Sequence, residues 1–360
     1  MPTALVTGAG GLIGAECVQE FVRAGFDVLG IDNDMRALYF GREASTRTVT
    51  DDLTATLPEY RHIAADIRDE AAVEAAFSTA RELELVVHAA AQPSHDWAAS
   101  DPKTDFGVNA VGTLNLLEAT RRHAPDATFI FMSTNKVYGD LPNHLPLIEL
   151  QTRLEVDPSH PCAEGIDHTM SIDRSLHSLF GVSKASADLL VQEYGRYFGM
   201  RTVCFRGGCL TGPRHAGAEL HGFLSYLMRC AVTGEPYTVF GHGGKQVRDN
   251  LHSADVVSAF LAFHADPESG AVYNLGGGRE SNCSVLEAII LCEQITGRSL
   301  AWRLDDHARK GDHMWWVTDL RPFQARHPSW ATRYGIESIL REIHDHNAER
   351  WGPVSAATVR

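Results

Sequence analysis

Thr3-Ala-Leu-Val-Thr-Gly-Ala-Gly-Gly-Leu-Ile-Gly14 is the stretch that decides the fold of this chain of 360 residues. Residues 4–6 have the length and β-branching of a buried strand, and residues 15–24 repeat apolar positions at the helical period. Between them, Gly8, Gly11 and Gly14 follow the spacing G-x-x-G-x-x-G. Glycines at this spacing permit a tight turn, close approach of the backbone to a pyrophosphate, and packing of the helix on its strand. The stretch predicts a strand–loop–helix unit whose first helical turn faces phosphates.

A second apolar segment, residues 26–31, ends at Asp32, eighteen residues after Gly14. An acidic side chain at this point accepts hydrogen bonds from the diol of an adenosine ribose and repels a 2′-phosphate. Arg36 lies close in the sequence and weakens that preference. The order of strand, glycines, helix, strand and acid therefore predicts a dinucleotide site that favours NAD over NADP. The alternative is a doubly wound domain with an empty crevice.

Composition and charge restrict the possible partners. Hydrophobic residues make up 44% and charged residues 22% of the chain, which is ordinary for a globular protein. The formal net charge of −14 argues against a nucleic acid and against an anionic membrane surface as partners. Phosphate-bearing ligands must then be bound by local arginines and helix N-termini rather than by the overall field.

The cysteines and the amino-terminal segment predict the compartment. Seven cysteines contain no C-x-x-C pair, which indicates reduced, mostly packed thiols. The first predicted strand begins by residue 3, which leaves no room for a signal peptide, and no apolar run approaches membrane length. We expect a cytoplasmic protein without a membrane partner.

Strands and helices alternate along the first two thirds of the chain. Further strands are predicted at residues 62–66, 83–88, 127–132, 201–206 and 272–275, and helices at residues 71–80, 105–122 and 176–198. Residues 33–58 are polar and receive no element. This alternation predicts an α/β fold, a doubly wound, mostly parallel Rossmann sheet.

Residues 140–175 are too long and irregular for a simple connection, and we expect them to be an insertion that faces the substrate. Later segments, with helices at 220–233, 284–296 and 336–350 and a strand at 237–240, predict a smaller α+β substrate lobe. The expected division is 1–206 for the dinucleotide-binding domain and 207–360 mainly for the lobe, with segments near 245–275 returning to the first domain.

Ligands of such a sheet meet the carboxyl ends of its strands. Asp66 and Ile67 could meet an adenine edge, although Asp66 and Asp69 could equally serve to cap a helix. The small side chains of residues 89–91 would let a flat cofactor lie against the backbone, and packing is an equal explanation. The strand at 127–132 delivers Ser133 and Thr134 to the same edge.

These motifs resemble the extended short-chain dehydrogenase/reductase family, and within it the NAD-dependent nucleotide-sugar epimerases of the CDP-tyvelose (CDP-paratose) 2-epimerase type. The resemblance extends from residue 1 to about residue 320. Its most specific parts are Ser133-Thr-Asn-Lys-Val-Tyr-Gly-Asp140, the long insertion, and Gly244-Lys-Gln-Val-Arg-Asp-Asn-Leu-His-Ser-Ala-Asp255. It implies a homodimer that pairs through two helices.

The resemblance also implies roles for individual residues. Thr134 would be the active-site hydroxyl, and Lys184 would hold the nicotinamide ribose. The cofactor-binding set expected is Gly8, Gly11, Leu12, Ile13, Gly14, Asp32, Asn33, Asp66, Ile67, Ala89, Ala90, Ala91, Asn109, Ser133, Lys184 and Arg206. The substrate-binding set is Gln92, Asn135, Gly208, Cys209, Arg248 and Arg309, with the two arginines on the substrate diphosphate. The histidines show no metal-ligand spacing, and no metal is expected.

One residue departs from the family motif. The motif is Y-x-x-x-K, and this chain has Phe180 where the tyrosine belongs, so no hydroxyl can take or return a proton. General acid–base help contributes about 10²–10⁴ in rate. Three accounts are open. Another group transfers the proton, the protein catalyses a different reaction from the family, or the site has no catalytic activity. Lys184 is one candidate base if its pKa is lowered, and Lys136 and Tyr138 are the next, although a packed ring is an equal account of Tyr138.

We therefore predict an NAD-dependent nucleotide-sugar epimerase that removes and returns a hydride at a sugar carbon, C2 by resemblance. Sugar 4,6-dehydratases carry an acid pair after the active-site hydroxyl, and Asn135-Lys136 stands there instead. The alternatives are another nucleotide-sugar modification, such as oxidation or a dehydratase-like step, and a protein that binds NAD and sugar nucleotides without turnover.

Overall fold

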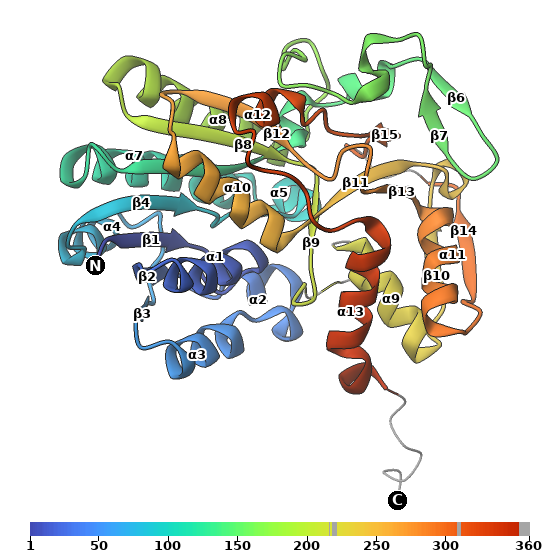
Figure 1. The fold of residues 1–360 in the computed structure, drawn as a ribbon, viewed down its shortest axis with the longest axis horizontal. Coiled ribbons are helices and arrows are strands. Elements are labelled where there is room, and N and C mark those ends of the chain that lie inside the picture. Colours follow the sequence, from blue (N-terminus) through green and yellow to red (C-terminus); the bar gives the residue numbers. More distant parts are fainter. Residues whose placement is uncertain (216, 218–221, 308–310, 353–360) are drawn as a thin grey trace, which may run out of the picture.

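A seven-stranded sheet forms the centre of the protein (Figure 1). The computed structural model describes residues 1–215, 217, 222–307 and 311–352. All neighbouring strands of this sheet are parallel, in the order β12-β8-β5-β4-β1-β2-β3. The strands are β1 (Thr3–Thr7), β2 (Asp27–Ile31), β3 (Tyr60–Ile63), β4 (Leu83–His88), β5 (Thr128–Thr134), β8 (Arg201–Gly207) and β12 (Ala271–Leu275). The predicted doubly wound fold class is confirmed.

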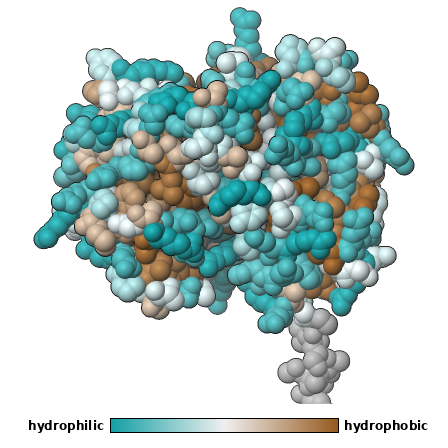
Figure 2. All heavy atoms as spheres, viewed as in Figure 1, coloured by the Kyte–Doolittle hydropathy of each residue, from teal (hydrophilic) through white to brown (hydrophobic). Residues whose placement is uncertain are grey.

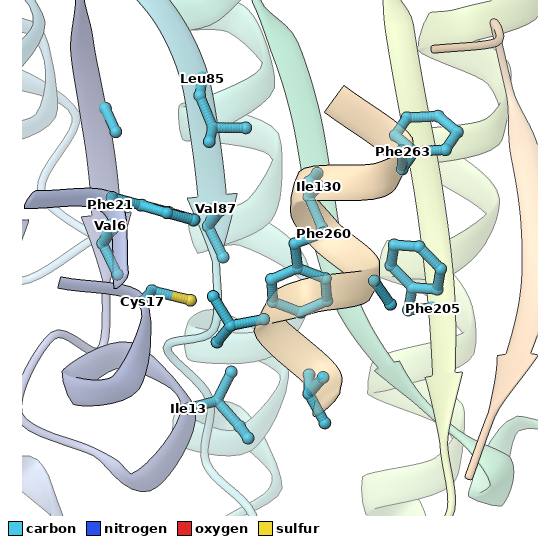
Figure 3. Packing of buried hydrophobic residues seen from close by; sticks show 14 of the residues in the cluster. Val6, Ile13, Cys17, Phe21, Leu85, Val87, Ile130, Phe205, Phe260 and Phe263 are labelled. Carbon is cyan, nitrogen blue, oxygen red and sulfur yellow. The ribbon is translucent and has the colours of Figure 1, made fainter. Parts of the chain in front are cut away.

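Helices cover both faces of this sheet. One face packs on α1 (Leu12–Arg23), α3 (Arg47–Thr56), α10 (Ser253–Ala265) and α12 (Arg321–Arg326), and Figure 3 shows part of that core. The other face packs on α4 (Glu70–Thr79), α7 (Gly112–His123) and α8 (Leu179–Phe198). Apolar side chains on both faces of each central strand account for this double cover, since parallel strands bury both faces.

The smaller lobe is built from the later part of the chain. Its helices are α9 (Phe223–Thr233), α11 (Val285–Thr296) and α13 (Ile336–Trp351), which share one apolar core. Its strands form small sheets: β9 (Cys209–Thr211), β11 (Val247–His252), β13 (Asn282–Ser284) and β15 (Trp315–Trp316) in one, β10 (Tyr237–Phe240) and β14 (Trp302–Asp305) in the other. In sequence, α10 and β12 lie between β11 and β13 of the lobe, but α10 packs on the large sheet and β12 is one of its strands.

Two expected features of the chain are corrected. Residues 33–58 contain the helices α2 (Met35–Phe40), η1 (Arg42–Ala44) and α3. In α3, Thr50 and Leu53 are buried on one face although the segment is polar in composition. The helix expected at 105–122 begins earlier, as α5 (His95–Ser100) and α6 (Pro102–Phe106), and a π-helical segment η2 (Gly107–Val111) separates α6 from α7.

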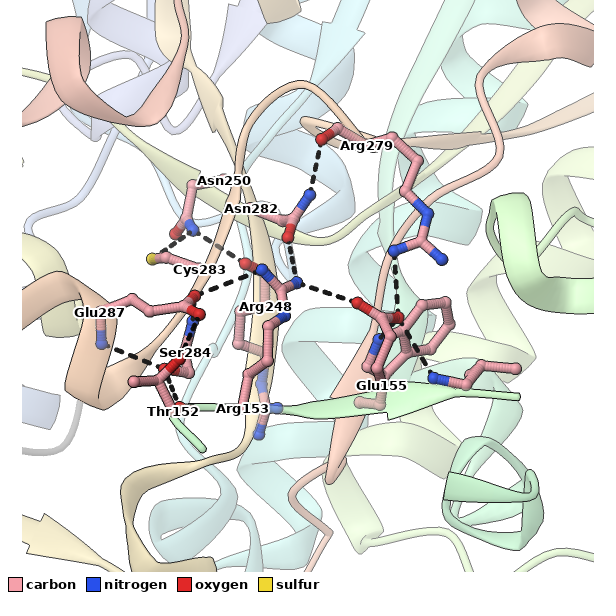
Figure 4. Close-up of polar contacts among 12 residues, drawn as sticks. Thr152, Arg153, Glu155, Arg248, Asn250, Arg279, Asn282, Cys283, Ser284 and Glu287 are labelled. Carbon is pink, nitrogen blue, oxygen red and sulfur yellow. Dashed lines mark hydrogen bonds and ion pairs between the residues drawn. The ribbon is translucent and has the colours of Figure 1, made fainter. Parts of the chain in front are cut away.

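The insertion at 140–175 is also different from what was expected. It carries short 3₁₀ helices, η4 (Leu141–His144) and η5 (Pro161–Glu164), and a hairpin of β6 (Leu147–Glu149) and β7 (Leu154–Val156). Arg153 of this hairpin lies 3.3 Å from the Glu287 carboxylate, and Thr152 donates to the same carboxylate at 2.9 Å; both residues face Glu287 in Figure 4. None of residues 140–175 lines the cleft described below, because the hairpin is bound to the outside of the lobe.

All seven cysteines carry free thiols. Within the described ranges, we find no helix with the length and apolar content to cross a membrane. In the view of Figure 1 the visible surface is mostly hydrophilic, and apolar side chains form smaller patches on it (Figure 2).

Candidate active site

One cleft of about 1040 Å³ runs along the carboxyl edge of the large sheet and continues under the lobe. The loop between β1 and α1 and the ends of β2, β4 and β5 supply one wall. The helix α8, the strands β9 and β11, and the start of α9 supply the other. The carboxyl ends of parallel strands meet at one edge, so residues far apart in sequence gather in this cleft.

The glycine loop forms the floor of one end of the cleft. Gly8 has φ +70°, and a Cβ there would lie 2.8 Å from the amide nitrogen of Ala90. A Cβ at Gly14 would lie 2.0 Å from the carbonyl oxygen of Gly8, so only glycine lets α1 pack on this turn. Gly11 caps α1 without a side chain, and the first turn of α1 lines the cleft. Backbone N–H groups exposed at such a turn fit a pyrophosphate.

Asp32 lies beside this loop at the end of β2. Its Oδ2 accepts a hydrogen bond from the Gly10 N–H at 3.0 Å, and its Oδ1 accepts from the Asp34 N–H at 2.8 Å and from the Thr46 hydroxyl at 2.9 Å. A carboxylate oxygen can accept two hydrogen bonds, so Oδ2 could also accept one from a ribose hydroxyl. The loop and this acid together fit an adenosine diphosphate, and Asn33, Asp66, Ile67 and residues 89–91 line the same end of the cleft.

Thr134, Phe180 and Lys184 all line the cleft. Thr134 ends β5, and its hydroxyl accepts a hydrogen bond from the Lys136 N–H at 3.2 Å. Lys184 donates to the Met132 carbonyl at 2.9 Å and is 3% exposed. Burial lowers the pKa of Lys184 from 10.5 to about 8. The structure thus brings three of the residues predicted as catalytic together.

A cationic group lies deeper under the lobe. The ammonium of Lys136, on η3 (Asn135–Tyr138), donates to the Gly311 carbonyl at 2.7 Å and lies 3.6 Å from Asp312. Burial lowers the pKa of Lys136 to about 8, with Asp312 opposing the shift and Arg248 adding to it. Arg248 lines the cleft from β11, beside Asn250 (Figure 4). Asn135, Gly208 and Cys209 line this end as well.

Tyr138 and Arg206 lie outside the cleft, contrary to the prediction from sequence. Tyr138 is fully buried, stacks on Trp316 and donates to Asn274 at 2.6 Å. Arg206 donates to the Tyr138 hydroxyl at 3.0 Å and pairs with Asp188 at 2.8 Å. Both polar groups are already satisfied inside the protein, so neither faces a ligand. Ser133 lines the cleft, although its hydroxyl points to Asp188 at 2.5 Å.

Asn109 and Gln92 are also buried rather than cleft-lining. The Asn109 amide donates to the Gln92 carbonyl at 3.1 Å and to Ser183 at 3.0 Å. The Gln92 side chain donates to Asp105 at 2.8 Å. These bonds connect the end of β4 to α8, so the two amides position the parts of these elements that line the cleft. Arg309, predicted to bind the diphosphate, lies outside the described residues.

Several cleft residues were missed from sequence. His95 and Trp97 follow the small-residue stretch after β4, and Arg214 and His215 follow β9. In the sequence these residues are marked by their position alone. Each follows a strand that ends at the ligand edge, a few residues after the segment predicted to bind a ligand. In the part of the chain that the structure describes, no cluster of histidine, cysteine and acidic side chains could hold a metal ion.

Comparison with known proteins agrees with this geometry. The family profile described as "NAD dependent epimerase/dehydratase family" matches residues 4–276. The chain is 29% identical to CDP-paratose 2-epimerase of Salmonella typhi, over 95% of this chain and 98% of that protein. It is 28% identical to dTDP-glucose 4,6-dehydratase of Salmonella typhimurium, over 83% of this chain and 79% of that protein.

The solved structure of UDP-glucose 4-epimerase from Thermus thermophilus, a complex with NAD, superposes with a TM-score of 0.76. It is 25% identical and covers 96% of this chain and 98% of its own. The match to the family profile covers about three quarters of the chain and includes the glycine loop, Thr134 and Lys184. The chain therefore belongs to the NAD-dependent epimerase/dehydratase family, and its cofactor is NAD.

Proposed function

We propose that the protein is a nucleotide-sugar epimerase that inverts a sugar carbon, C2 of the hexose, by removing and returning a hydride. The observation that carries the proposal is one continuous cleft lined by the glycine loop, by Thr134 and Lys184, and by Arg248. The similarity to CDP-paratose 2-epimerase supports position C2. NAD⁺ bound in the cleft would accept the hydride and give it back, so no external reductant is needed.

Different residues of the cleft would bind the cofactor, the substrate and the reacting oxygen. Thr134 would donate a hydrogen bond to the reacting oxygen, and Lys184 would hold the nicotinamide ribose. Phe180, 7% exposed, would shape the pocket beside it. The substrate diphosphate would lie toward Arg248 and Lys136, since a protein of net charge −14 needs local cations to bind an anion. We propose Arg309 as a further diphosphate ligand.

Epimerisation is favoured over dehydration by the residues after Thr134. A dehydratase needs an acid to protonate the leaving hydroxyl and a base to remove a proton, and Asn135-Lys136 offers an amide and a cation instead. Lys136 is held by Gly311 and Asp312 as a charged donor. The second candidate is a protein that binds NAD and a sugar nucleotide without turnover, and the missing hydroxyl at Phe180 favours it.

The test is a screen of CDP-, UDP-, GDP- and dTDP-glucose with the purified protein, followed by mass spectrometry and NMR. We expect NAD to be retained through purification, a second sugar of unchanged mass, and no build-up of absorbance at the NADH wavelength. Accumulating NADH would show a net dehydrogenase, and loss of one water a dehydratase. Thermal stabilisation by a nucleotide sugar without product would show a silent binder. Each of these three results would overturn epimerisation.

We also propose a homodimer. The segment α6–η2–α7 packs beside α8, and the outer faces of both carry exposed apolar residues: Phe106, Val111, Leu114, Leu179, Val182 and Leu189. Two such faces related by a two-fold axis would bury this stripe in a four-helix contact. Light scattering should give twice the chain mass, and Leu114→Glu with Val182→Glu should give a monomer.

The domain division and the compartment remain proposals as well. We keep residues 1–206 as the NAD domain and 207–360 as mainly the substrate lobe, with the segment around α10 and β12 assigned to the first. The cytoplasm is the proposed location, because seven free thiols fit a reducing compartment.

A further inference from the structure

We propose that His95 is the group that takes and returns the proton of the sugar hydroxyl, in place of the tyrosine that Phe180 replaces. This inference rests on the proposed function, because it assigns a residue to that reaction. It starts from a contact: the His95 and Phe180 rings meet edge to face, with centroids 5.0 Å apart. An imidazole therefore stands beside the ring that lacks the motif hydroxyl.

The placement of His95 is built by several elements. It is the first residue of α5, which packs against α8, and Ser94 caps that helix by accepting a hydrogen bond from the Trp97 N–H at 3.2 Å. On the other side, a Cβ at Gly311 would lie 3.4 Å from His95 Cε1 and Nδ1. The backbone at Gly311 therefore lies within van der Waals reach of the imidazole. The ring is thus held between α8 and the segment that also receives the Lys136 ammonium.

The other titratable groups at this end of the cleft are less suited to the task. Lys184 donates to the Met132 carbonyl and lies 4.1 Å over the Phe131 ring, which directs its ammonium toward the strand. The Lys136 ammonium lies 3.6 Å from Asp312 and donates to the Gly311 carbonyl, so these two residues already occupy it. Burial raises the pKa of the Cys209 thiol to about 11, which keeps it neutral.

The step balances without an added reagent. His95 accepts the proton of the sugar hydroxyl while that carbon loses its hydride to the bound NAD⁺, which leaves a ketone. After the ketone turns, His95 returns the proton as the hydride comes back to the opposite face. The sugar is first oxidised and then reduced. Imidazole is suited to both directions because it exchanges protons near neutral pH.

The elements around His95 carry both acidic and basic side chains. They are Asp96 on α5, Lys184 on α8, His177 before α8, Lys136 on η3, and Asp312 and His313 between β14 and β15. Since these groups carry both signs, the pH profile has to be measured on variants of His95 itself.

The test first asks whether a sugar reaches His95. Histidine-labelled protein with bound NAD is titrated with CDP-, UDP-, GDP- or dTDP-glucose, and in parallel with the matching nucleoside diphosphate. The His95 Cε1–H resonance is assigned by its loss in His95→Gln. We expect the glucose conjugate that stabilises the protein against heat to shift this resonance, and the diphosphate alone to leave it in place. Binding with an unmoved His95 signal would overturn the inference and leave the proposed function standing. If none of the four nucleoside-diphosphate glucoses binds, the proposed function and this inference are both wrong.

The second arm measures turnover of that conjugate. His95→Gln keeps a hydrogen-bonding side chain without a titrating group, and we expect a fall in turnover of about 10²–10⁴-fold. The decline in rate on acidification should disappear, while NAD content and melting temperature stay unchanged. His144→Gln, at an exposed histidine outside the cleft, is the control. Adding Phe180→Tyr to His95→Gln should restore turnover at least tenfold. Wild-type turnover in His95→Gln, or no rescue by the tyrosine, would overturn the inference.

Discussion

Removing Asp188 should destabilise the protein far more than removing any exposed acid. Asp188 lies on α8 with its side chain 1% exposed. Its two oxygens accept hydrogen bonds from Ser133 at 2.5 Å, from Gln192 at 2.6 Å, and from Arg206 at 2.8 and 3.1 Å. These bonds join α8 to β5 and β8, directly below Thr134. Asp188→Ala leaves the Arg206 guanidinium buried without its counter-ion.

The magnitude follows from that burial. Breaking a buried ion pair by removing one partner costs about 3–5 kcal/mol, whereas an exposed pair contributes about 0–1 kcal/mol. The entropy of unfolding is about 2.1 cal/mol/K per residue near the melting temperature. For a chain of 360 residues, this cost corresponds to a fall in melting temperature of about 4–7 °C.

Scanning calorimetry of the NAD-loaded protein is the assay. The matched control is Asp345→Ala, whose carboxylate is 78% exposed and paired with His344. Its melting temperature should change by no more than about 1.3 °C. Asp188→Leu combined with Arg206→Met removes both charges and should recover more than half of the loss. The double variant should also retain NAD, since Arg206 lies outside the cleft. A melting temperature of Asp188→Ala within about 1 °C of wild type would show that the Asp188–Arg206 pair does not stabilise the fold.

Three further variants test the cleft. Gly14→Ala should abolish retention of NAD, because its Cβ would lie 2.0 Å from the Gly8 carbonyl oxygen. The control Gly335→Ala should retain NAD, because the atom nearest to its Cβ would be 3.8 Å away. The NAD content of the purified proteins is the measurement. Lys184→Met should reduce turnover about 10²-fold, because the nicotinamide ribose would no longer be positioned. Circular dichroism should show that the fold persists, and unchanged turnover would contradict the role of Lys184. Lys136 should lose its positive charge as the pH rises through about 8, because burial lowers its pKa from 10.5. The affinity for a nucleotide sugar should therefore weaken above pH 8 in calorimetric titrations, and Lys136→Arg should remove that dependence.

The alternation of elements and the dinucleotide signature could be predicted from the sequence because both are local. Residues 3–14 contain a strand, a turn that only glycine allows and a helix start, and Asp32 follows at the end of the next strand. Phe180 and Lys184 lie one turn apart on one helix, so their meeting was also predictable. Arg206 was wrongly assigned to the site, and of the two accounts given for Tyr138 the packed ring is the one observed. Adjacency to Thr134 in sequence or in the sheet does not say to which face a side chain turns.

What the sequence alone determined is the sheet, its glycine turn and the residues that line the strand ends. Which polar side chains are bonded inside the protein and which face the cleft depends on the tertiary structure. Asn109, Gln92, Ser133 and Arg206 are satisfied by partners far along the chain, and such partners are set by packing rather than by spacing. The same packing brought His95, from α5, onto Phe180, from α8. Their meeting depends on the contact between the two helices, which no local pattern records.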